Sequence, residues 1–207
     1  MLATAAALVI LGGSIAPFLT PIYVAFEQSR TDVPSLTGYS PTTVDRITTT
    51  ILGDLVLWAG DFAVLDDGGR MVLTDAERSH MRDVRNVFAG LWLLVALSIL
   101  TLVVAFRRAK SLEARAGAWR AVRNGARWLA VVIAVAGVFA AVAFDTAFEM
   151  FHRLFFSAGS YDFDPATSKL IQLFPDRFWS ETSIVVGAVI IVVSIVVAWL
   201  AARRARA

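Results

Sequence analysis

The stretch TSIVVGAVIIVVSIVVAWLAA, residues 182–202, decides the fold because it contains no ionisable side chain. A helix needs about 20 predominantly apolar residues to cross the hydrocarbon core of a bilayer. The chain of 207 residues is 57% hydrophobic and only 17% charged, whereas soluble domains average about 25% charged residues. Similar runs occur earlier in the chain, so we expect membrane-spanning helices over about 1–26, 86–106, 128–148 and 182–202. An ordinary soluble globular protein is excluded.

The first apolar run predicts a retained helix rather than a cleaved signal peptide. It has no basic start, its apolar stretch is too long, and no small-x-small cleavage site precedes Glu27. We therefore expect one integral membrane domain over residues 1–207. Its fold class is an all-α membrane protein of four transmembrane helices with a small extracellular α+β part.

Basic residues are distributed unevenly between the connecting segments. The loop 107–127 has seven Lys and Arg against one acid, and three Arg follow residue 202, which together give +9. Residues 27–85 and 145–181 sum to −7, so the net charge of +2 hides a strong asymmetry. Because basic loops stay on the cytoplasmic side, we expect both termini and loop 107–127 in the cytoplasm. The outer segments 27–85 and 149–181 then face the extracellular side.

Several chemistries are excluded by composition and motif. The basic loop is explained by its position beside anionic lipid, so we expect no nucleic-acid partner. Cysteine is absent, which excludes disulfides, zinc-thiolate sites, iron–sulfur clusters and thiol nucleophiles. Phosphate-binding glycine loops and a G-x-S-x-G elbow are missing. The span centres also lack the ionisable residues that transporters carry at mid-membrane. We expect no cofactor and no bound metal.

The first outer segment predicts an amphipathic helix and a hairpin. Ser40 is a candidate N-cap with Pro41 at the first helical position. The apolar residues that follow at helical spacing are Val44, Ile47, Ile51, Leu55 and Trp58. The helix lies in the outer interface or caps the bundle. Residues 62–65 and 70–73 flank Asp66-Asp67-Gly68-Gly69, which predicts a short β-hairpin.

Helices are also expected where the outer segments adjoin the spans. Thr74 and Glu77 form a T-x-x-E capping box, which predicts a helix from about Asp75 into the second span. The third span has no Pro or Gly between residues 138 and 156, so we expect it to continue outward as one helix. Asp164-Pro165 predicts a short helix through Phe174.

Two histidines, His80 and His152, are the only ones in the chain. The expected topology places both on outward helical extensions at comparable heights, so they can meet. Glu77 and Asp83 lie at i−3 and i+3 from His80, close enough to orient its ring or raise its pKa. Glu149 stands at i−3 from His152, and Asp145 lies further below on the same helix.

Other interpretations of the histidines stay open. Each can be an interfacial residue satisfied by a neighbouring carboxylate, and Asp145 can simply mark the membrane edge. Two histidines with two carboxylates also supply metal-ligand types. The HxxxH and HExxH spacings are absent, however, and the ligands would come from separate helices.

At these residues the sequence resembles the lipoprotein intramolecular transacylase (Lit) family of four-span bacterial membrane proteins. One matching block runs from Glu77 to Arg85 as ERSHMRDVR. The other begins FHRLFF at Phe151 and continues through Asp164-Pro165 to Phe178-Trp179. Departures occur where the family pattern has an Asn, a Trp and an acid. This chain has Ala158, Tyr161 and Ser168 there, which affects acyl or peptide preference if those positions shape the site.

The resemblance implies an acyltransferase. It would move the sn-2 acyl chain of a diacylglyceryl lipoprotein to the lipoprotein's own N-terminal cysteine amine, leaving a lyso-form lipoprotein in the bacterial cell membrane. His80, oriented by Asp83 or Glu77, would take the amine proton while His152 donates one, or the roles are exchanged. Asp145 and Glu149 are further orienting candidates. The candidates for lining the substrate site are Phe151, Phe155, Phe156 and Tyr161.

Two alternatives belong to other classes of protein. A non-enzymatic sensor or assembly subunit would bind a partner at its outer face and tolerate replacement of both histidines. A metal-dependent membrane hydrolase would require a bound metal ion and lose activity with chelators. Fold alone does not separate these possibilities, because function depends on the site.

Overall fold

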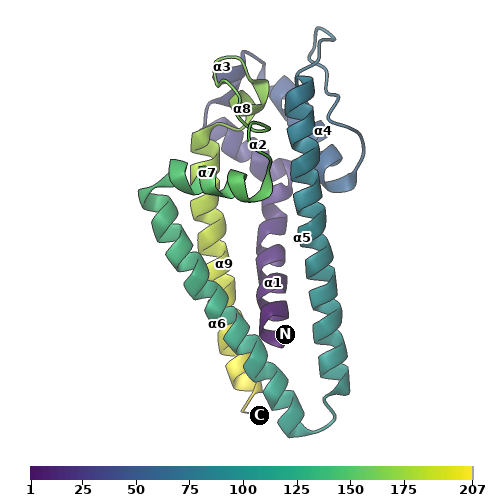
Figure 1. Ribbon diagram of the computed structural model, residues 1–207, viewed down its shortest axis with the longest axis vertical. Coiled ribbons are helices and arrows are strands. Elements are labelled where there is room, and N and C mark those ends of the chain that lie inside the picture. Colours follow the sequence, from purple (N-terminus) through teal and green to yellow (C-terminus); the bar gives the residue numbers. More distant parts are fainter. Residues whose placement is uncertain (207) are drawn as a thin grey trace. The chain divides into compact units, whose positions relative to one another are not determined.

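The computed structural model describes residues 1–206 and is nearly all helical (Figure 1). In this described part of the chain, four helices are long and apolar enough to cross a membrane, over Leu2–Leu19, Asp75–Arg108, Leu112–Val142 and Asp176–Arg204. The expected multi-pass, helical membrane protein is confirmed. The elements in chain order are α1 (Leu2–Ile15), the 3-10 helix η1 (Ala16–Leu19), α2 (Pro21–Arg30), α3 (Val33–Thr37), α4 (Pro41–Leu57), α5 (Asp75–Arg108), α6 (Leu112–Val142), α7 (Phe144–Phe155), α8 (Lys169–Leu173) and α9 (Asp176–Arg204).

One compact unit consists of residues 1–16, 90–142 and 184–206. Small residues allow its helices to approach closely. A Cβ on Gly125 of α6 would lie 2.0 Å from the carbonyl oxygen of Ala3 in α1. A Cβ on Gly12 would lie 2.5 Å from Cγ2 of Val95 in α5. Such contacts are typical of helices in lipid, where close packing takes the place of a hydrophobic driving force.

The second compact unit consists of residues 17–89 and 143–183, and its core is organised by α4. Ser40 caps this helix by accepting a hydrogen bond from the backbone N–H of Thr43 at 3.1 Å. The predicted apolar face is buried, whereas Trp58 lies beyond the helix end in a left-handed conformation and is exposed. The buried residues of that face are Val44, Ile47, Ile51 and Leu55. The helix is therefore a core element of this unit.

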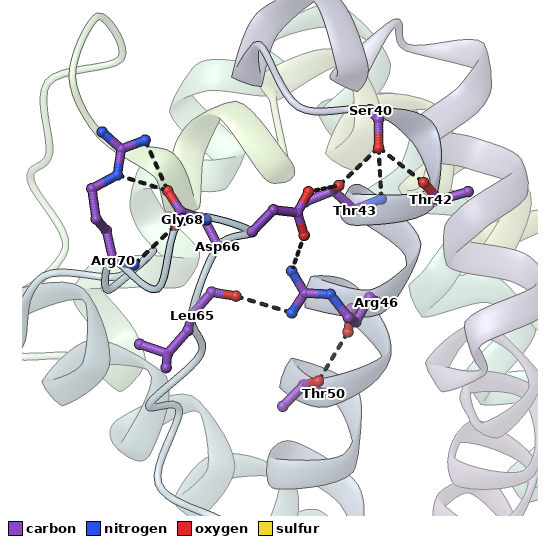
Figure 2. Close-up of polar contacts among 10 residues, drawn as sticks. Ser40, Thr42, Thr43, Arg46, Thr50, Leu65, Asp66, Gly68 and Arg70 are labelled. Atoms are coloured by element: carbon purple, nitrogen blue, oxygen red, sulfur yellow. Dashed lines mark hydrogen bonds and ion pairs between the residues drawn. The ribbon is translucent and has the colours of Figure 1, made fainter.

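The start of α4 is joined to the turn that follows it in sequence (Figure 2). Arg46 donates hydrogen bonds to the carbonyl oxygen of Leu65 at 3.0 Å and to Asp67 at 2.8 Å. The hydroxyl of Thr43 also donates to Asp67. These side chains hold the turn against α4.

The predicted β-hairpin is reduced to one antiparallel bridge, between Leu65 and Met71, and no strand occurs between residues 1 and 206. The α+β description is therefore not confirmed. The carboxylate of Asp66 accepts hydrogen bonds from the backbone N–H groups of Gly68 and Arg70, at 2.8 and 2.9 Å. Because this side chain satisfies the turn and α5 begins at Asp75, little extended chain remains to form a ladder.

The capping box at the start of α5 is confirmed. The backbone N–H of Thr74 donates to Glu77 at 2.7 Å, and the N–H of Glu77 donates back to the Thr74 hydroxyl at 3.3 Å. From Asp75 the helix continues without interruption to Arg108. Its charge-free segment begins at Asn86, so the first three turns precede the apolar run.

The prediction of one continuous helix over residues 138–156 is wrong. The helix α6 ends at Val142, and Ala143 leaves the helical conformation with φ −142° and ψ 60° before α7 begins at Phe144. At this residue the sequence changes from a segment that is apolar on all sides, at the end of α6, to an amphipathic segment, α7. An all-round apolar helix is stable in hydrocarbon, whereas a two-faced helix is stable at an interface.

The short helix near residue 164 starts later than expected. Asp164 instead forms a turn, because its carbonyl oxygen accepts hydrogen bonds from the N–H groups of Thr167 and Ser168. Ser168 then caps α8 by accepting from the N–H of Ile171 at 3.2 Å. The helix ends at Leu173.

Candidate active site

Glu77 is almost completely buried, and its carboxylate is fully engaged by hydrogen-bond donors. One oxygen accepts from the N–H and hydroxyl of Thr74, at 2.7 and 2.9 Å. The other accepts from the hydroxyl of Ser168 at 2.5 Å and the N–H of Leu170 at 3.0 Å. Burial raises the pKa of Glu77, but these hydrogen bonds outweigh it and lower the pKa below its usual value. The residue joins the start of α5 to the start of α8.

His80 lies one turn further along α5 and is buried among aromatic rings. Its ring centroid is 4.8 Å from that of Phe156 and 5.9 Å from that of Phe163. Its Nδ1 atom is buried without a hydrogen-bond partner. Burial, together with the nearby His152, lowers the pKa of His80 to about 4, against a weaker opposing effect of Asp83. The ring is therefore neutral at physiological pH.

His152 lies in α7 and stacks near His80, with ring centroids 6.0 Å apart and planes inclined by 21°. Its Nδ1 is 2.8 Å from the carbonyl oxygen of Phe148. A carbonyl oxygen only accepts hydrogen bonds, so Nδ1 carries the proton and donates it. In the neutral ring, the lone pair is then on Nε2.

A pocket of about 520 Å³ opens beside His152. It combines aromatic rings with charged groups, and the loop after α7 forms one side. Its lining residues are Phe148, Glu149, His152, Arg153, Phe156, Ala158, Gly159, Tyr161, Asp162 and Phe163. Because its lining is both polar and apolar, the pocket suits a ligand that joins an apolar chain to a reactive polar centre.

Of the predicted orienting residues, only Glu149 lines the pocket. It accepts hydrogen bonds from Arg153 at 2.7 Å and from the Tyr161 hydroxyl at 3.4 Å. The carboxylate of Glu77 accepts hydrogen bonds from Thr74, Ser168 and Leu170. Asp83 is half-buried and affects His80 through its charge. Asp145 is exposed in the first turn of α7.

The predicted aromatic residues divide into two groups. Phe156 and Tyr161 line the pocket, and the ring of Tyr161 lies 4.9 Å from that of His152. Phe151 and Phe155 are about half exposed and pack against each other, with centroids 4.9 Å apart. They lie outside the pocket lining.

Sequence reasoning missed the Phe148 carbonyl, Phe163 and Asp162. The carbonyl is a backbone group, which no sequence motif identifies. Phe163 and Asp162 follow Gly159, whose φ of 80° turns the loop. Because glycine readily adopts a positive φ, Gly159 was the residue in the sequence that could have indicated a turn bringing the loop back to His152.

The sequence matches the family of the lipoprotein intramolecular transacylase Lit over residues 1–179. The chain belongs to the Lit family. It is therefore a membrane acyltransferase of the lipoprotein transacylase class. A comparison with curated proteins finds no match.

Solved structures of Lit from Bacillus cereus have the same fold. One, determined in meso, has a TM-score of 0.81 at 18% identity and covers 99% of this chain and 93% of its own. A second has a histidine replaced by arginine and a TM-score of 0.74 at 16% identity, covering 99% and 89% of the two chains. A third, with a histidine replaced by alanine, has a TM-score of 0.72 at 17% identity and covers 99% and 90%.

The three departures from the Lit pattern lie at the site. Ala158 and Tyr161 line the pocket. Ser168 donates its hydroxyl hydrogen to Glu77. A serine hydroxyl donates in its ordinary neutral state, whereas a carboxyl group could donate to Glu77 only when protonated.

Proposed function

We propose that the chain moves the sn-2 acyl group of a diacylglyceryl lipoprotein to the α-amine of the lipoprotein's own N-terminal cysteine. The observation that carries this proposal is the His80–His152 pair beside an aromatic pocket. Family membership supports the class of substrate. The direction of transfer and the roles of the histidines are inferred from the chemistry below.

The reaction is an isomerisation and needs no second substrate. The amine nitrogen attacks the carbonyl carbon of the sn-2 ester, so a C–N bond forms and the C–O bond to glycerol breaks. One proton leaves the nitrogen and one is delivered to the departing glyceryl oxygen. Both reacting groups belong to one molecule, so holding them in register supplies much of the rate enhancement.

His152 acts as the proton acceptor in this proposal. The Phe148 carbonyl holds its Nδ1 proton, which directs the Nε2 lone pair to the substrate. The α-amine attacks in its neutral form, which is readily populated because the pKa of its ammonium is near roughly 8. His152 takes the one proton that the nitrogen then loses as the C–N bond forms. The resulting imidazolium then returns its proton to the glyceryl oxygen. The sequence left the two histidine roles exchangeable, and the hydrogen bond at Nδ1 favours this assignment.

His80 acts as a neutral hydrogen-bond donor. Its burial keeps the ring uncharged, and a neutral imidazole donates through one nitrogen only. Directed at the ester carbonyl oxygen, this N–H stabilises the negative charge that develops as the amine attacks. The charge of Asp83 raises the pKa of His80, and this effect does not involve a hydrogen bond. Glu77 supports the site by holding the first turn of α5.

The pocket accommodates the reacting end of the lipoprotein, with Phe156 and Tyr161 around the ester and Phe151 and Phe155 toward the acyl chains. Loop 107–127 and both termini lie in the cytoplasm, and the active face is extracellular. The charge asymmetry between the two sides supports this orientation. Membrane lipid surrounds the spans and nucleic acid has no role.

Replacing each histidine tests the proposal. His80→Ala and His152→Ala variants are expressed in a bacterial host that lacks the activity, and lipoprotein N-termini are identified by mass spectrometry. The wild-type chain yields lyso-form lipoprotein, and either variant yields diacyl lipoprotein. A matched control is Arg70→Ala, since Arg70 lies on the exposed turn after α4. Lyso product from a histidine variant at the wild-type level would overturn that residue's role.

Among the described residues 1–206, no group of three His, Asp or Glu side chains is placed to hold a metal ion. A sensor or assembly subunit would leave lipoproteins unchanged with the wild-type chain too, so the same mass spectra separate it from the transacylase.

A further inference from the structure

The helix α7 presents three different sectors around its axis. Four large apolar side chains are exposed on one sector, with exposed fractions from 47% to 75%. They are Met150, Phe151, Leu154 and Phe155. Asp145, Glu149 and Arg153 occupy the opposite sector, as follows from 3.6 residues per turn. A 12-residue helix with this division is unlike the spans, which are apolar all round.

Phe148 and His152 occupy the boundary between these two sectors. With 100° per residue, each is flanked by the apolar sector on one side and by the charged sector on the other. Both residues line the pocket. The reactive imidazole is thus located at the line where the surface of this helix changes from apolar to polar.

The chain itself indicates what covers the apolar sector. Only Ala143 separates the first residue of α7 from Val142, the last residue of the membrane-spanning α6. The apolar sector therefore belongs to the helix that directly follows a membrane-spanning segment in the sequence, so lipid is the solvent of the preceding helix. Arg153 and Glu149 pair with each other on the charged side, which suits the headgroup region.

We propose that α7 lies in the outer membrane interface, with its Met150–Phe155 apolar sector among acyl chains, and so sets the depth of His152. The ester bonds of a glycerolipid lie where hydrocarbon meets headgroup. A histidine on the boundary of an interfacial helix is at that depth, so the ester reaches it without leaving the membrane. This inference rests on the proposed function for its role in catalysis, whereas the position of α7 is tested independently.

The absence of native cysteine makes a direct depth measurement possible. Leu154→Cys and Phe151→Cys variants of the full chain carry a nitroxide spin label in vesicles of phosphatidylglycerol and phosphatidylethanolamine. Thr146→Cys, on the charged side of the same helix, is the matched control. Power saturation compares collisions with oxygen, which partitions into hydrocarbon, against collisions with a water-soluble nickel chelate.

We expect the oxygen-to-nickel ratio to be several-fold higher at Leu154 and Phe151 than at Thr146. Equal, water-like ratios at all three positions would overturn the proposal. If the labels at both apolar positions were immobilised and shielded from both reagents, the proposal would be overturned, because a protein partner would then cover the apolar sector. Two apolar positions are used so that a local defect in one variant does not decide the outcome.

Activity measurements separate this inference from the proposed function. Leu154→Glu places a charge in the apolar sector and is expected to lower the rate of lyso-product formation several-fold, whereas Thr146→Glu leaves it unchanged. Lipid-like label ratios without any transfer by the wild-type chain would contradict the proposed function and leave the position of α7 intact. Equal activity of Leu154→Glu and the wild-type chain would overturn the role of depth in catalysis.

Discussion

Glu77 and His80 occupy neighbouring turns of α5, and both are ionisable side chains with little exposure to solvent. Their surroundings differ in how many hydrogen bonds they provide. Glu77 accepts four hydrogen bonds, from Thr74, Ser168 and Leu170. His80 has a buried Nδ1 with no partner and is packed among aromatic rings.

The difference shows what each region does. A buried polar group that is fully hydrogen-bonded costs little and fixes the structure around it. An unsatisfied buried group costs free energy and persists where function needs it. The Glu77 region therefore contributes to stability, and we propose that the His80–His152 region carries the reactivity.

The largest expected effect separates chemistry from stability at His152. His152→Ala removes the proposed proton acceptor, and general acid–base groups typically contribute about 1,000-fold to rate. We expect lyso-product formation in proteoliposomes to fall by about that factor, while thermal unfolding in detergent changes little. A rate within tenfold of wild type would show that another group takes the proton.

The second test removes the Glu77 carboxylate. Glu77→Ala leaves four donors without an acceptor, two on Thr74 and one each on Ser168 and Leu170, at about 1 kcal/mol each. We expect the free energy of unfolding to fall by about 4 kcal/mol, measured by thermal unfolding in detergent. Arg70→Ala is the control, because the Arg70 side chain is 82% exposed and the backbone N–H of residue 70 still donates to Asp66, so the expected loss is about 0.5 kcal/mol. Equal melting temperatures of the two variants would contradict the assignment of stability to Glu77.

The third test reverses the usual outcome of a core substitution. His80→Leu has a similar volume and removes the unsatisfied Nδ1, so the variant is expected to be about 1 kcal/mol more stable than wild type. Its transacylation is expected to be lost. Thermal unfolding and mass spectrometry of lipoproteins check both parts. A variant that is both less stable and active would invert the comparison between the two regions.

The last effect is a dependence of stability on pH. The pKa of His80 is about 4 in the folded chain and near 6.5 when unfolded. Between these values the unfolded state binds the extra proton, so stability falls as pH decreases from 6.5 toward 4. We expect the melting temperature of the wild-type chain to decrease over this pH range, and we expect a smaller decrease for His80→Leu. Parallel curves for the two proteins would show that His80 is not the group responsible.

Local signals predicted local structure well. The Thr74–Glu77 box starts α5 at the expected residue, and Ser40 caps α4 as expected. The same kind of reasoning failed over residues 138–156, because the absence of Pro and Gly permits a continuous helix without requiring one. The change from all-round to two-faced polarity at Phe144 was present in the sequence and marks the break.

The candidate site was predictable in its residue types and only partly in its geometry. His80 and His152 were identified as the only histidines on outer helical extensions. Glu77 was expected to orient His80, because it lies one turn away on the same helix. In the structure its oxygens are used by Ser168 and Leu170, distant in sequence, and this partner choice depends on how α8 packs.

The sequence by itself determined the four apolar runs, the charge asymmetry and the helix caps, because each depends on composition or on neighbours within one turn. Only the tertiary structure decided that His80 and His152 stack, that Phe148 holds the tautomer of His152, and that Glu77 is a structural acceptor. These are contacts through space, set by packing and by competition for hydrogen-bond partners. The periodicity of apolar residues specifies which face of a helix is buried, but it does not specify which residues of other elements pack against that face.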